Sequence, residues 1–483
     1  MASASSHPRL GAALLTVAVT ATLFWFGNGL NPIWPLMWIA PLPVLVFASR
    51  NSRSATAVTA FFSVWLGSLN LWHYLRVLQA PPTVWLIIFT IAALVFMAAV
   101  LLFRALLLRG AVWSALVAFP AAWVVYEYVR NVTTSGGTAG SFAYSQLGFL
   151  SFLQLASLTG PWGMTFFLLL FSTALAIGRH LRSTAPKKAI QVVIAGWGSI
   201  VLVLIFGMVR MAIPSRGPRV RVGLITSDAR DNVYVADPGA NTERLFRDYA
   251  AAAETLASRG AKAIVLPEKL GTIVGRGTTS TDAIFQSLAD KTGATIVVGL
   301  VDVAAPVEYN QARVYAPEAP VSLYAKQHML PPMESMFTPG TTLTPLQRPS
   351  GAWGVAICKD MDFSAPSRLY GEAGVGLMLV PGWDFNIDRG WHGHIAIMRG
   401  VESGFSIAHA AKNGYLTVSD NRGRILGQTR SDSAPFATLI AEAPVAHAST
   451  LYLLWGDWFA WLSLALLVVA LIQLFQLRAV PDR

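Results

Sequence analysis

Eight long apolar segments constrain the fold of this 483-residue chain more than any other feature. Seven of them lie within the first 212 residues, and the eighth lies near the carboxyl end. Each is close to the length that the hydrocarbon core of a bilayer requires, so we expect about eight transmembrane helices. The segments are residues 10–26, 34–48, 56–73, 84–102, 112–129, 162–177, 189–209 and 458–477.

Lysine and arginine are distributed unevenly over the connections between these segments. If the segments alternate across the membrane, one side carries little beyond Arg76 and Arg130. The other side carries Arg9, Arg50, Arg53, Arg104, Arg109, Arg179, Arg182, Lys187, Lys188, Arg478 and Arg483. The positive-inside rule places this basic side in the cytoplasm. We therefore expect a multi-pass protein of the bacterial cytoplasmic (inner) membrane, with the segment from about Arg210 to Tyr452 on the extracytoplasmic face.

The composition agrees with a chain that lies partly in lipid. Hydrophobic residues make up 54% of the sequence and charged residues only 13%, whereas soluble domains carry about a quarter charged residues. The formal net charge of +11 could suggest a nucleic-acid partner. Because the basic residues follow the pattern of membrane topology, we expect membrane lipid as a partner and no nucleic acid.

The segment after the seventh span has a different sequence pattern. Short apolar runs alternate with polar turns and with amphipathic patterns such as residues 241–258, which is typical of a layered α/β domain. The expected strands are residues 220–226, 263–267, 295–300, 321–324, 354–357, 377–381 and 417–420. We therefore predict a seven-helix transmembrane domain over 1–212, a catalytic domain over 213–449, and a C-terminal transmembrane helix with a tail over 450–483.

The only cysteine of the chain, Cys358, stands where a short apolar run ends. The segment from Ser364 to Tyr370 follows it and has a helical pattern, which gives a strand, turn and helix around the thiol. Such a turn presents a nucleophile at a sheet edge and can aim backbone N–H groups at the same point. A lone cysteine can also be a small buried hydrophobic residue, and the surrounding residues must decide between the two interpretations.

Two further polar side chains follow expected strands in the same domain. Glu268 closes the run that begins at Ala263, and Lys326 closes the run that begins at Val321. A carboxylate, an ammonium group and a thiol can converge on one edge of a sheet. Glu268 could then accept the thiol proton of Cys358 while Lys326 stabilises the oxyanion that forms on an ester or amide carbonyl.

At these residues the chain resembles the nitrilase superfamily, and within it the membrane-embedded apolipoprotein N-acyltransferases. The similarity extends over more than 400 residues in matching order. In the membrane half it rests on Asn31–Leu36, Trp123–Arg130, Tyr144–Gln146, Gln154–Ala156 and Thr159–Gly163. In the outer domain it rests on Pro267–Glu268, Tyr309–Asn310, Lys326–Pro331, Glu334, Cys358, His392–Glu402, Asn413–Gly414, Thr450, Tyr452 and Gly456–Trp458.

The resemblance implies a nitrilase-like αββα sandwich and a two-step acyl transfer. A phospholipid donates an acyl chain to the cysteine as a thioester, and the chain then passes to the α-amino group of a diacylglyceryl-modified lipoprotein. Carried over to this sequence, Glu268 is the base, Lys326 the oxyanion-stabilising lysine, Cys358 the nucleophile, and Glu334 a second glutamate that orients the lysine. The family requires no cofactor and no metal, and we expect none here.

The sequence departs from the family beside the nucleophile and in a later loop. Lys359 and Asp360 stand where the family usually has an aromatic residue and a glutamate, and Trp383 and Phe385 have altered spacing. We expect Asp360, Trp383 and Phe385 to bind substrate. A cation at position 359 is expected to lower the pKa of the adjacent thiol.

Two other functions remain compatible with the sequence. One is a membrane-tethered amidase in which water replaces the amine acceptor, and the other is an inert relative that serves as a scaffold. The His392-x-His394 pair does not indicate a metal site, because two residues two apart on a helix do not share a face. The intact set of Glu268, Lys326 and Cys358 argues against the scaffold.

Overall fold

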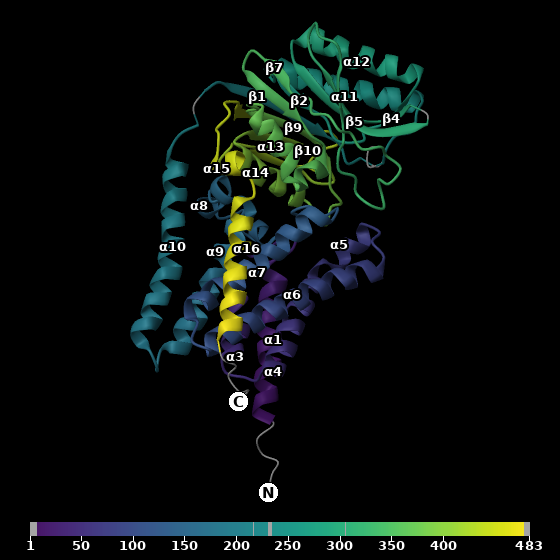
Figure 1. Cartoon of the computed structure of the whole chain (residues 1–483). Helices are drawn as coiled ribbons and strands as arrows, with labels where there is room; N and C mark the ends of the chain where they lie inside the picture. Colours follow the sequence, from purple (N-terminus) through teal and green to yellow (C-terminus); the bar gives the residue numbers. More distant parts are fainter. Residues whose placement is uncertain (1–6, 216, 230–233, 305, 478–483) are drawn as a thin grey trace. The chain divides into compact units, whose positions relative to one another are not determined.

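A computed structural model describes residues 7–215, 217–229, 234–304 and 306–477 of the chain. The chain divides into two compact units (Figure 1). The first unit comprises the described parts of 1–134, 140–212 and 455–483, and the second comprises those of 135–139 and 213–454. The domain limits expected from the sequence, at residues 212 and 449, remain predictions.

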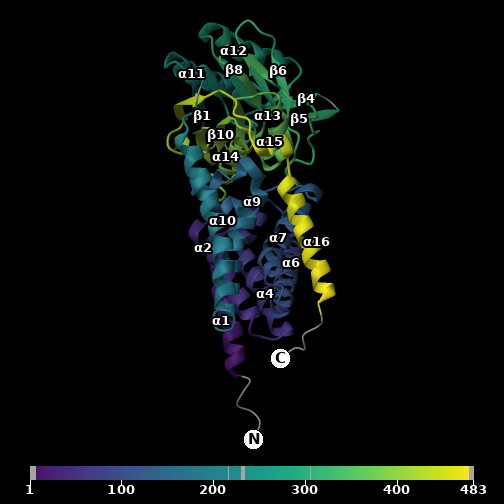
Figure 2. The same ribbon diagram turned by 60° about the vertical axis from the view of Figure 1, so that its left-hand side comes forward.

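The first unit is helical. Among the described residues, seven helical segments are long and apolar enough to cross a membrane, and each coincides with an expected span. Figure 2 shows the last of them, α16, running alongside α7 within this unit. The helices are α1 (His7–Gly27), α2 (Trp34–Ile39), α3 (Leu42–Ala48), α4 (Arg53–Ser68), α5 (Trp72–Val77), α6 (Pro82–Leu108), α7 (Val112–Thr133), α8 (Leu150–Leu153), α9 (Ala156–Leu181), α10 (Pro186–Ala212) and α16 (Trp458–Gln476).

The second expected span, residues 34–48, is not one continuous helix. It consists of α2, which ends at Ile39, and α3, which begins after Pro41. Proline has no backbone N–H, and its ring clashes with the carbonyl of the preceding turn, so a helix breaks there. The segment is therefore a pair of short apolar helices, and the seven other spans are the ones with full membrane length.

The second unit is built from two β-sheets. The first has the strand order β13-β1-β2-β4-β5-β6, with β3 paired to β4, and the second has the order β12-β11-β10-β9-β8-β7. The strands of the first sheet are β1 (Arg219–Thr226), β2 (Ala263–Val265), β3 (Thr272–Val274), β4 (Thr295–Ala304), β5 (Val307–Tyr315), β6 (Ser322–Ala325) and β13 (Ala437–Pro444). Those of the second are β7 (Leu346–Arg348), β8 (Gly351–Val355), β9 (Leu377–Trp383), β10 (Ser406–Lys412), β11 (Tyr415–Ser419) and β12 (Ile425–Arg430).

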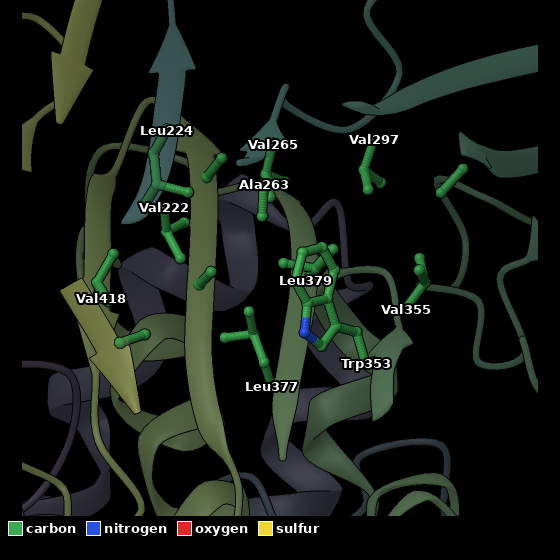
Figure 3. Packing of buried hydrophobic residues seen from close by; sticks show 14 of the residues in the cluster. Val222, Leu224, Ala263, Val265, Val297, Trp353, Val355, Leu377, Leu379 and Val418 are labelled. Atoms are coloured by element: carbon green, nitrogen blue, oxygen red, sulfur yellow. The ribbon is translucent and has the colours of Figure 1, made fainter. Parts of the chain in front are cut away.

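The two sheets pack face to face over an apolar core (Figure 3). Successive residues of a strand point to opposite faces, so Leu224 of β1 enters this core while Ile225 packs under the helices on the outer face. The helices of this unit are α11 (Ala240–Ser258), α12 (Arg276–Thr292), α13 (Ser364–Glu372) and α14 (Trp391–Ser403), and α15 (Leu451–Trp455) ends near the unit boundary. Helices α11 and α12 cover the first sheet, and α13 and α14 cover the second. The expected αββα sandwich is confirmed.

The strand directions bring the polar ends of several strands together. In the first sheet β1, β2 and β4 are parallel, and in the second β8, β9 and β10 are parallel. Parallel strands end at the same edge of a sheet. Glu268 follows β2, Cys358 follows β8, and Trp383 and Lys412 are the last residues of β9 and β10. The fold thus gathers the candidate site at one edge of the sandwich.

Candidate active site

The nucleophile candidate occupies a strained turn. Cys358 begins a 3-10 turn that runs to Asp362, and its φ of +39° lies in the left-handed region that residues other than glycine rarely adopt. Its side chain is buried, and its Sγ lies 3.8 Å from the carbonyl oxygen of Trp383. Strained backbone of this kind persists where the surrounding structure fixes it, often at functional sites. The turn therefore holds the thiol in one direction.

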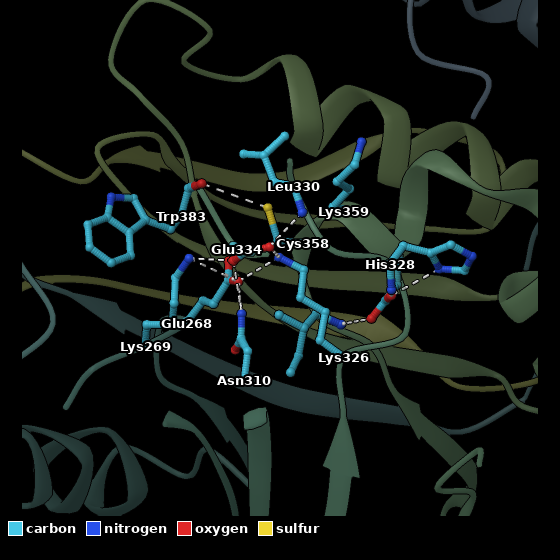
Figure 4. A network of polar contacts seen from close by, with 12 residues as sticks. Glu268, Lys269, Asn310, Lys326, His328, Leu330, Glu334, Cys358, Lys359 and Trp383 are labelled. Atoms are coloured by element: carbon cyan, nitrogen blue, oxygen red, sulfur yellow. Dashed lines mark hydrogen bonds and ion pairs between the residues drawn. The ribbon is translucent and has the colours of Figure 1, made fainter. Parts of the chain in front are cut away.

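A lysine and a glutamate face each other beside this turn (Figure 4). Nζ of Lys326 donates to Oε1 of Glu268 at 2.8 Å, and Nδ2 of Asn310 donates to the same oxygen at 2.6 Å. All three side chains are buried. Burial makes such charge-assisted hydrogen bonds strong and directional, so the carboxylate and the ammonium group hold each other in place.

A second glutamate shares the same lysine. Oε2 of Glu334 accepts from Nζ of Lys326 at 2.8 Å and from the backbone N–H of Leu330 at 2.9 Å. Its Oε1 accepts from Nδ2 of Asn310 at 3.1 Å and from Nζ of Lys269. The two carboxylates and two ammonium groups thus form one buried network around Lys326.

Electrostatics fix the protonation states in this network. Burial lowers the pKa of Lys326, but Glu268 and Glu334 raise it more, and the net pKa lies well above the ordinary value. Burial raises the pKa of Glu334, but Lys326 and Lys269 lower it further, to a net value well below the ordinary one. Lys326 is therefore a cation and Glu334 an anion at neutral pH.

The thiol is held in its neutral form. Burial raises the pKa of Cys358 well above its ordinary value, Glu268 raises it further, and Lys326 lowers it. The expected lowering by the neighbouring cation is therefore wrong. Nζ of Lys359 instead pairs with Oδ2 of Asp362 at 3.1 Å, so its charge is compensated at a carboxylate and not at the thiol.

Most of the side chains named so far line a small cavity of about 70 Å³. Charged groups form one part of its wall and apolar side chains the other. Its lining residues are Glu268, Lys269, Lys326, Leu330, Met333, Glu334, Cys358, Lys359, Trp383, Phe385 and His392. The structure therefore brings together all four residues proposed from the sequence for catalysis, along with Trp383 and Phe385.

Asp360 is placed differently from the expectation that it binds substrate. Its side chain is fully buried and is absent from the cavity wall. It accepts hydrogen bonds from the backbone N–H groups of Gln327, His328 and Ile357 and from the hydroxyl of Tyr324. A carboxylate with this many donors ties the segment after Lys326 to the nucleophile turn, so its position is that of a structural anchor.

Three residues of the site received no functional role from the sequence. Lys269 is adjacent to Glu268, so the same motif could have indicated it. Asn310 lies inside β5 and entered the sequence analysis only as part of the Tyr309–Asn310 segment, with no role assigned, and Lys412 ends a strand that is buried along its whole length. A buried strand gives no alternating pattern, so periodicity gives no signal that would assign these two residues to the site.

No group of three or more potential metal ligands occurs in the part of the chain that the structure describes. His392 and His394 lie on α14 in different surroundings. His392 faces Asp362 and Asp388, whereas burial lowers the pKa of His394.

Comparison with known families divides the chain in two. Residues 8–174 match the family described as Apolipoprotein N-acyltransferase N-terminal domain, and residues 232–446 match the family described as Carbon-nitrogen hydrolase. The first match lies in the helical part of the chain, and the second lies in the sandwich part.

Curated relatives match across most of the chain. The Apolipoprotein N-acyltransferase of Geobacter metallireducens is 27% identical and covers 73% of this chain and 73% of its own length. That of Gloeobacter violaceus is 25% identical and covers 90% and 89% respectively. Among solved structures, an amidase from Nesterenkonia sp. is 20% identical, with a TM-score of 0.41, and the match covers 47% of this chain and 92% of the amidase. From the two family matches and the curated relatives, the chain belongs to the apolipoprotein N-acyltransferase family.

Proposed function

We propose that this protein moves a fatty acyl chain from a phospholipid to the α-amino group of a diacylglyceryl-cysteine lipoprotein, through a thioester on Cys358. The observation that carries the proposal is the shared cavity of Cys358, Glu268, Lys326 and Glu334, in which a nucleophile, a base and a cation meet. The acyltransferase names of the curated relatives support it over an amidase.

The first half-reaction forms the thioester. Glu268 accepts the thiol proton as Sγ of Cys358 attacks the ester carbonyl carbon of the phospholipid. The bonds from Lys326 and Asn310 both fall on Oε1 of Glu268, which leaves Oε2 to take that proton. When the tetrahedral intermediate collapses, the C–O bond breaks, and Glu268 returns the proton to the departing glycerol oxygen. Lysophospholipid leaves, and the acyl group stays on sulfur.

The buried thiol suits this order of events. Because burial and the Glu268 charge raise the pKa of Cys358, the thiolate forms only as Glu268 accepts its proton. Once Glu268 is neutral, the charge of Lys326 is compensated by one carboxylate fewer. Lys326 can then stabilise the oxyanion that develops on the carbonyl oxygen, the place where electrostatic stabilisation contributes most to catalysis.

The second half-reaction releases the acyl chain to an amine. The α-amino group of the diacylglyceryl-cysteine attacks the thioester carbon, Glu268 accepts a proton from nitrogen, and the C–S bond breaks. The thiolate of Cys358 takes the proton back from Glu268, which restores the resting site. Both substrates carry long acyl chains, and a chain with seven helices of membrane length suits substrates that stay in a bilayer. The proposed site is on the extracytoplasmic face of the inner membrane.

Ping-pong kinetics test this function. Incubated with phospholipid vesicles alone, the purified protein should release about one equivalent of lysophospholipid in a burst and then stop, with the acyl group on Cys358 detectable by intact mass. Addition of a diacylglyceryl-cysteinyl peptide should restart turnover, and Cys358→Ala should show neither step. Continuous release of free fatty acid without an acceptor would instead identify a hydrolase.

A further inference from the structure

His392 lies between two aspartates at the start of α14. Its Nδ1 is 3.4 Å from Oδ1 of Asp362, and its Nε2 is 3.3 Å from Oδ2 of Asp388. The side chain is only 10% exposed, and it forms part of the cavity wall beside Cys358. The mechanism proposed above uses none of these three residues.

The geometry calls for a doubly protonated ring. A neutral imidazole carries one N–H, so it can serve only one of two carboxylates that lie on opposite ring nitrogens. Burial lowers the pKa of His392, but Asp362 and Asp388 raise it to a value well above the ordinary one. Burial raises the pKa of Asp362, but Lys359 and His392 lower it to about 2. The resulting unit is an imidazolium between two carboxylates.

The Asp362 end of this unit is fixed to the nucleophile turn. Asp362 is the last residue of the 3-10 turn that begins at Cys358. Its backbone carbonyl accepts from the N–H of Thr138 at 2.9 Å and from the hydroxyl of Thr138 at 2.7 Å. Its Oδ2 accepts from Lys359 at 3.1 Å. These contacts hold the carboxylate in place independently of His392.

The Asp388 end belongs to the loop 384–390 between β9 and α14. Oδ1 of Asp388 accepts from the backbone N–H of Phe385 at 2.6 Å, and its carbonyl accepts from the N–H of Trp391 at 2.7 Å. Phe385 and the preceding Trp383 both line the cavity. Asp388 is therefore tied to Phe385, which forms the aromatic wall of the cavity together with Trp383.

We propose that His392 is a positioning residue that, as an imidazolium, joins the nucleophile turn to the loop 384–390 and so fixes the aromatic wall of the acyl-binding cavity. The inference deepens the proposed function and rests on it only for the identity of what binds in the cavity. Ion-pair contacts of 3.4 Å to Asp362 and 3.3 Å to Asp388, made inside a buried site, supply the strength of the link.

Other charged groups face this unit. Lys359 contacts Asp362, and the buried carboxyl of Asp384 and the buried imidazole of His409 lie close enough to interact with His392 or Asp388 electrostatically. Burial raises the pKa of Asp384 well above its ordinary value, Asp388 raises it further, and His392 opposes both. Burial lowers the pKa of His409 to about 3, so it is neutral near pH 7. The groups in direct contact are Lys359 with Asp362 at 3.1 Å and His392 with Asp362 and Asp388 at 3.4 and 3.3 Å.

Hydrogen exchange tests the link without any assay of activity. The full-length protein in detergent is compared at pH 7 with His392→Gln and Asp388→Asn, and with His394→Gln as the matched control on the same helix. Gln at position 392 can serve only one aspartate. We expect amides of the peptide that covers 384–391, Phe385 included, to exchange about tenfold faster in both bridge variants and at the wild-type rate in the control. Unchanged exchange in the bridge variants, or equal acceleration in the control, overturns the link.

Steady-state kinetics then connect the link to the cavity. A looser wall weakens binding of the acyl chain but leaves Glu268 and Lys326 in place. His392→Gln should therefore raise the KM for phospholipid about tenfold and change kcat by less than about threefold. Faster exchange with an unchanged KM overturns the role in donor binding. If the wild-type protein transfers no acyl group while the exchange pattern holds, the proposed function fails and the link between the two loops stands.

Discussion

The ammonium group of Lys412 lies 3.9 Å from the centroid of the Trp383 indole ring. The lysine is fully buried, and its Nζ donates to the backbone carbonyl of Lys269 at 3.1 Å. The ring that lines the cavity is also faced by the ammonium group of Lys269, at 5.1 Å from its centroid. Burial lowers the pKa of Lys412, Lys269 lowers it further, Glu268 opposes both, and the net pKa is about 7.

This lowered pKa predicts a specific pH dependence of stability. Between pH 7 and pH 10 the unfolded chain keeps the Lys412 proton while the folded chain loses it, so the destabilisation present below pH 7 is relieved as the pH rises. We compare the free energy of unfolding of the wild type with that of Lys412→Met. The difference, wild type minus variant, should rise by on the order of 1–2 kcal/mol between pH 7 and pH 9. Thermal melting of both proteins in detergent measures this difference at each pH. For the control Lys291→Met, at a largely exposed side chain, the difference from the wild type should not change with pH.

Glu334→Gln tests the second glutamate. The substitution removes a negative charge that contacts both Lys326 and Lys269. Lys326, the proposed oxyanion-stabilising residue, then loses one of the two carboxylates that hold it in place. We expect the rate of acyl-enzyme formation to fall about a hundredfold or more, while Cys358 stays available to thiol reagents. Rapid-quench measurement of lysophospholipid release gives the rate. Glu442→Gln, at an exposed carboxylate, should retain the wild-type rate, and a wild-type rate in Glu334→Gln would remove the assigned role.

Asp360→Asn separates an anchor from a substrate contact. Asparagine has the same shape but only one acceptor oxygen, so it cannot satisfy the donors of Gln327, His328, Ile357 and Tyr324. We expect a loss of about 2–3 kcal/mol in the free energy of unfolding, with a matching loss of activity. A raised KM with unchanged thermal stability would instead restore the substrate-binding interpretation.

Gly299 packs against the backbone of Glu268, the proposed base. A Cβ at this position would lie 2.5 Å from the carbonyl oxygen of Pro267 and 2.6 Å from Cα of Glu268, so Gly299→Ala must displace the base. We expect kcat to fall by at least about tenfold, because small misplacements of a catalytic group are costly. Gly277→Ala is the matched control, since a Cβ there meets no atom within 4 Å. Equal kcat values for the two variants would contradict the prediction.

The membrane orientation is tested with topology reporters. A reporter active only outside the cytoplasm should work when fused after Gln347 and fail when fused after Leu107, because the basic connections are expected on the cytoplasmic side. Growth or colour assays of the two fusions give the answer. The opposite pattern would reverse the orientation and contradict the proposed site on the extracytoplasmic face.

Strands with a regular apolar pattern were predictable from the sequence. The run at 220–226 became β1 and the run at 377–381 became part of β9, because such runs end at turn residues that fix their limits. The strand Ser406–Lys412 was missed because it is buried on both faces and contains His409 and Lys412. Polar residues inside a buried strand hide it from any test of periodicity.

The candidate site was predictable only where its residues stand at strand ends. Glu268, Lys326 and Cys358 each follow an apolar run, and strand ends are where a layered α/β fold gathers side chains. The surroundings of Asp360 could not be predicted, because its donors come from a segment some 30 positions away that only the folded chain brings near. The same holds for His392, whose two aspartates both precede it in the sequence at different separations.

The proposed base and nucleophile come from different sheets of the sandwich. Glu268 and Lys326 follow strands of the first sheet, and Cys358 follows β8 of the second. The side chains packed between the two sheets therefore set the distance between Glu268 and Cys358. A shift of one sheet over the other would separate the two residues while the strands within each sheet stayed paired. On heating, the turnover rate should therefore fall at a lower temperature than the one at which the circular dichroism signal changes. A substitution such as Leu379→Val between the sheets should lower kcat in a protein that is still folded.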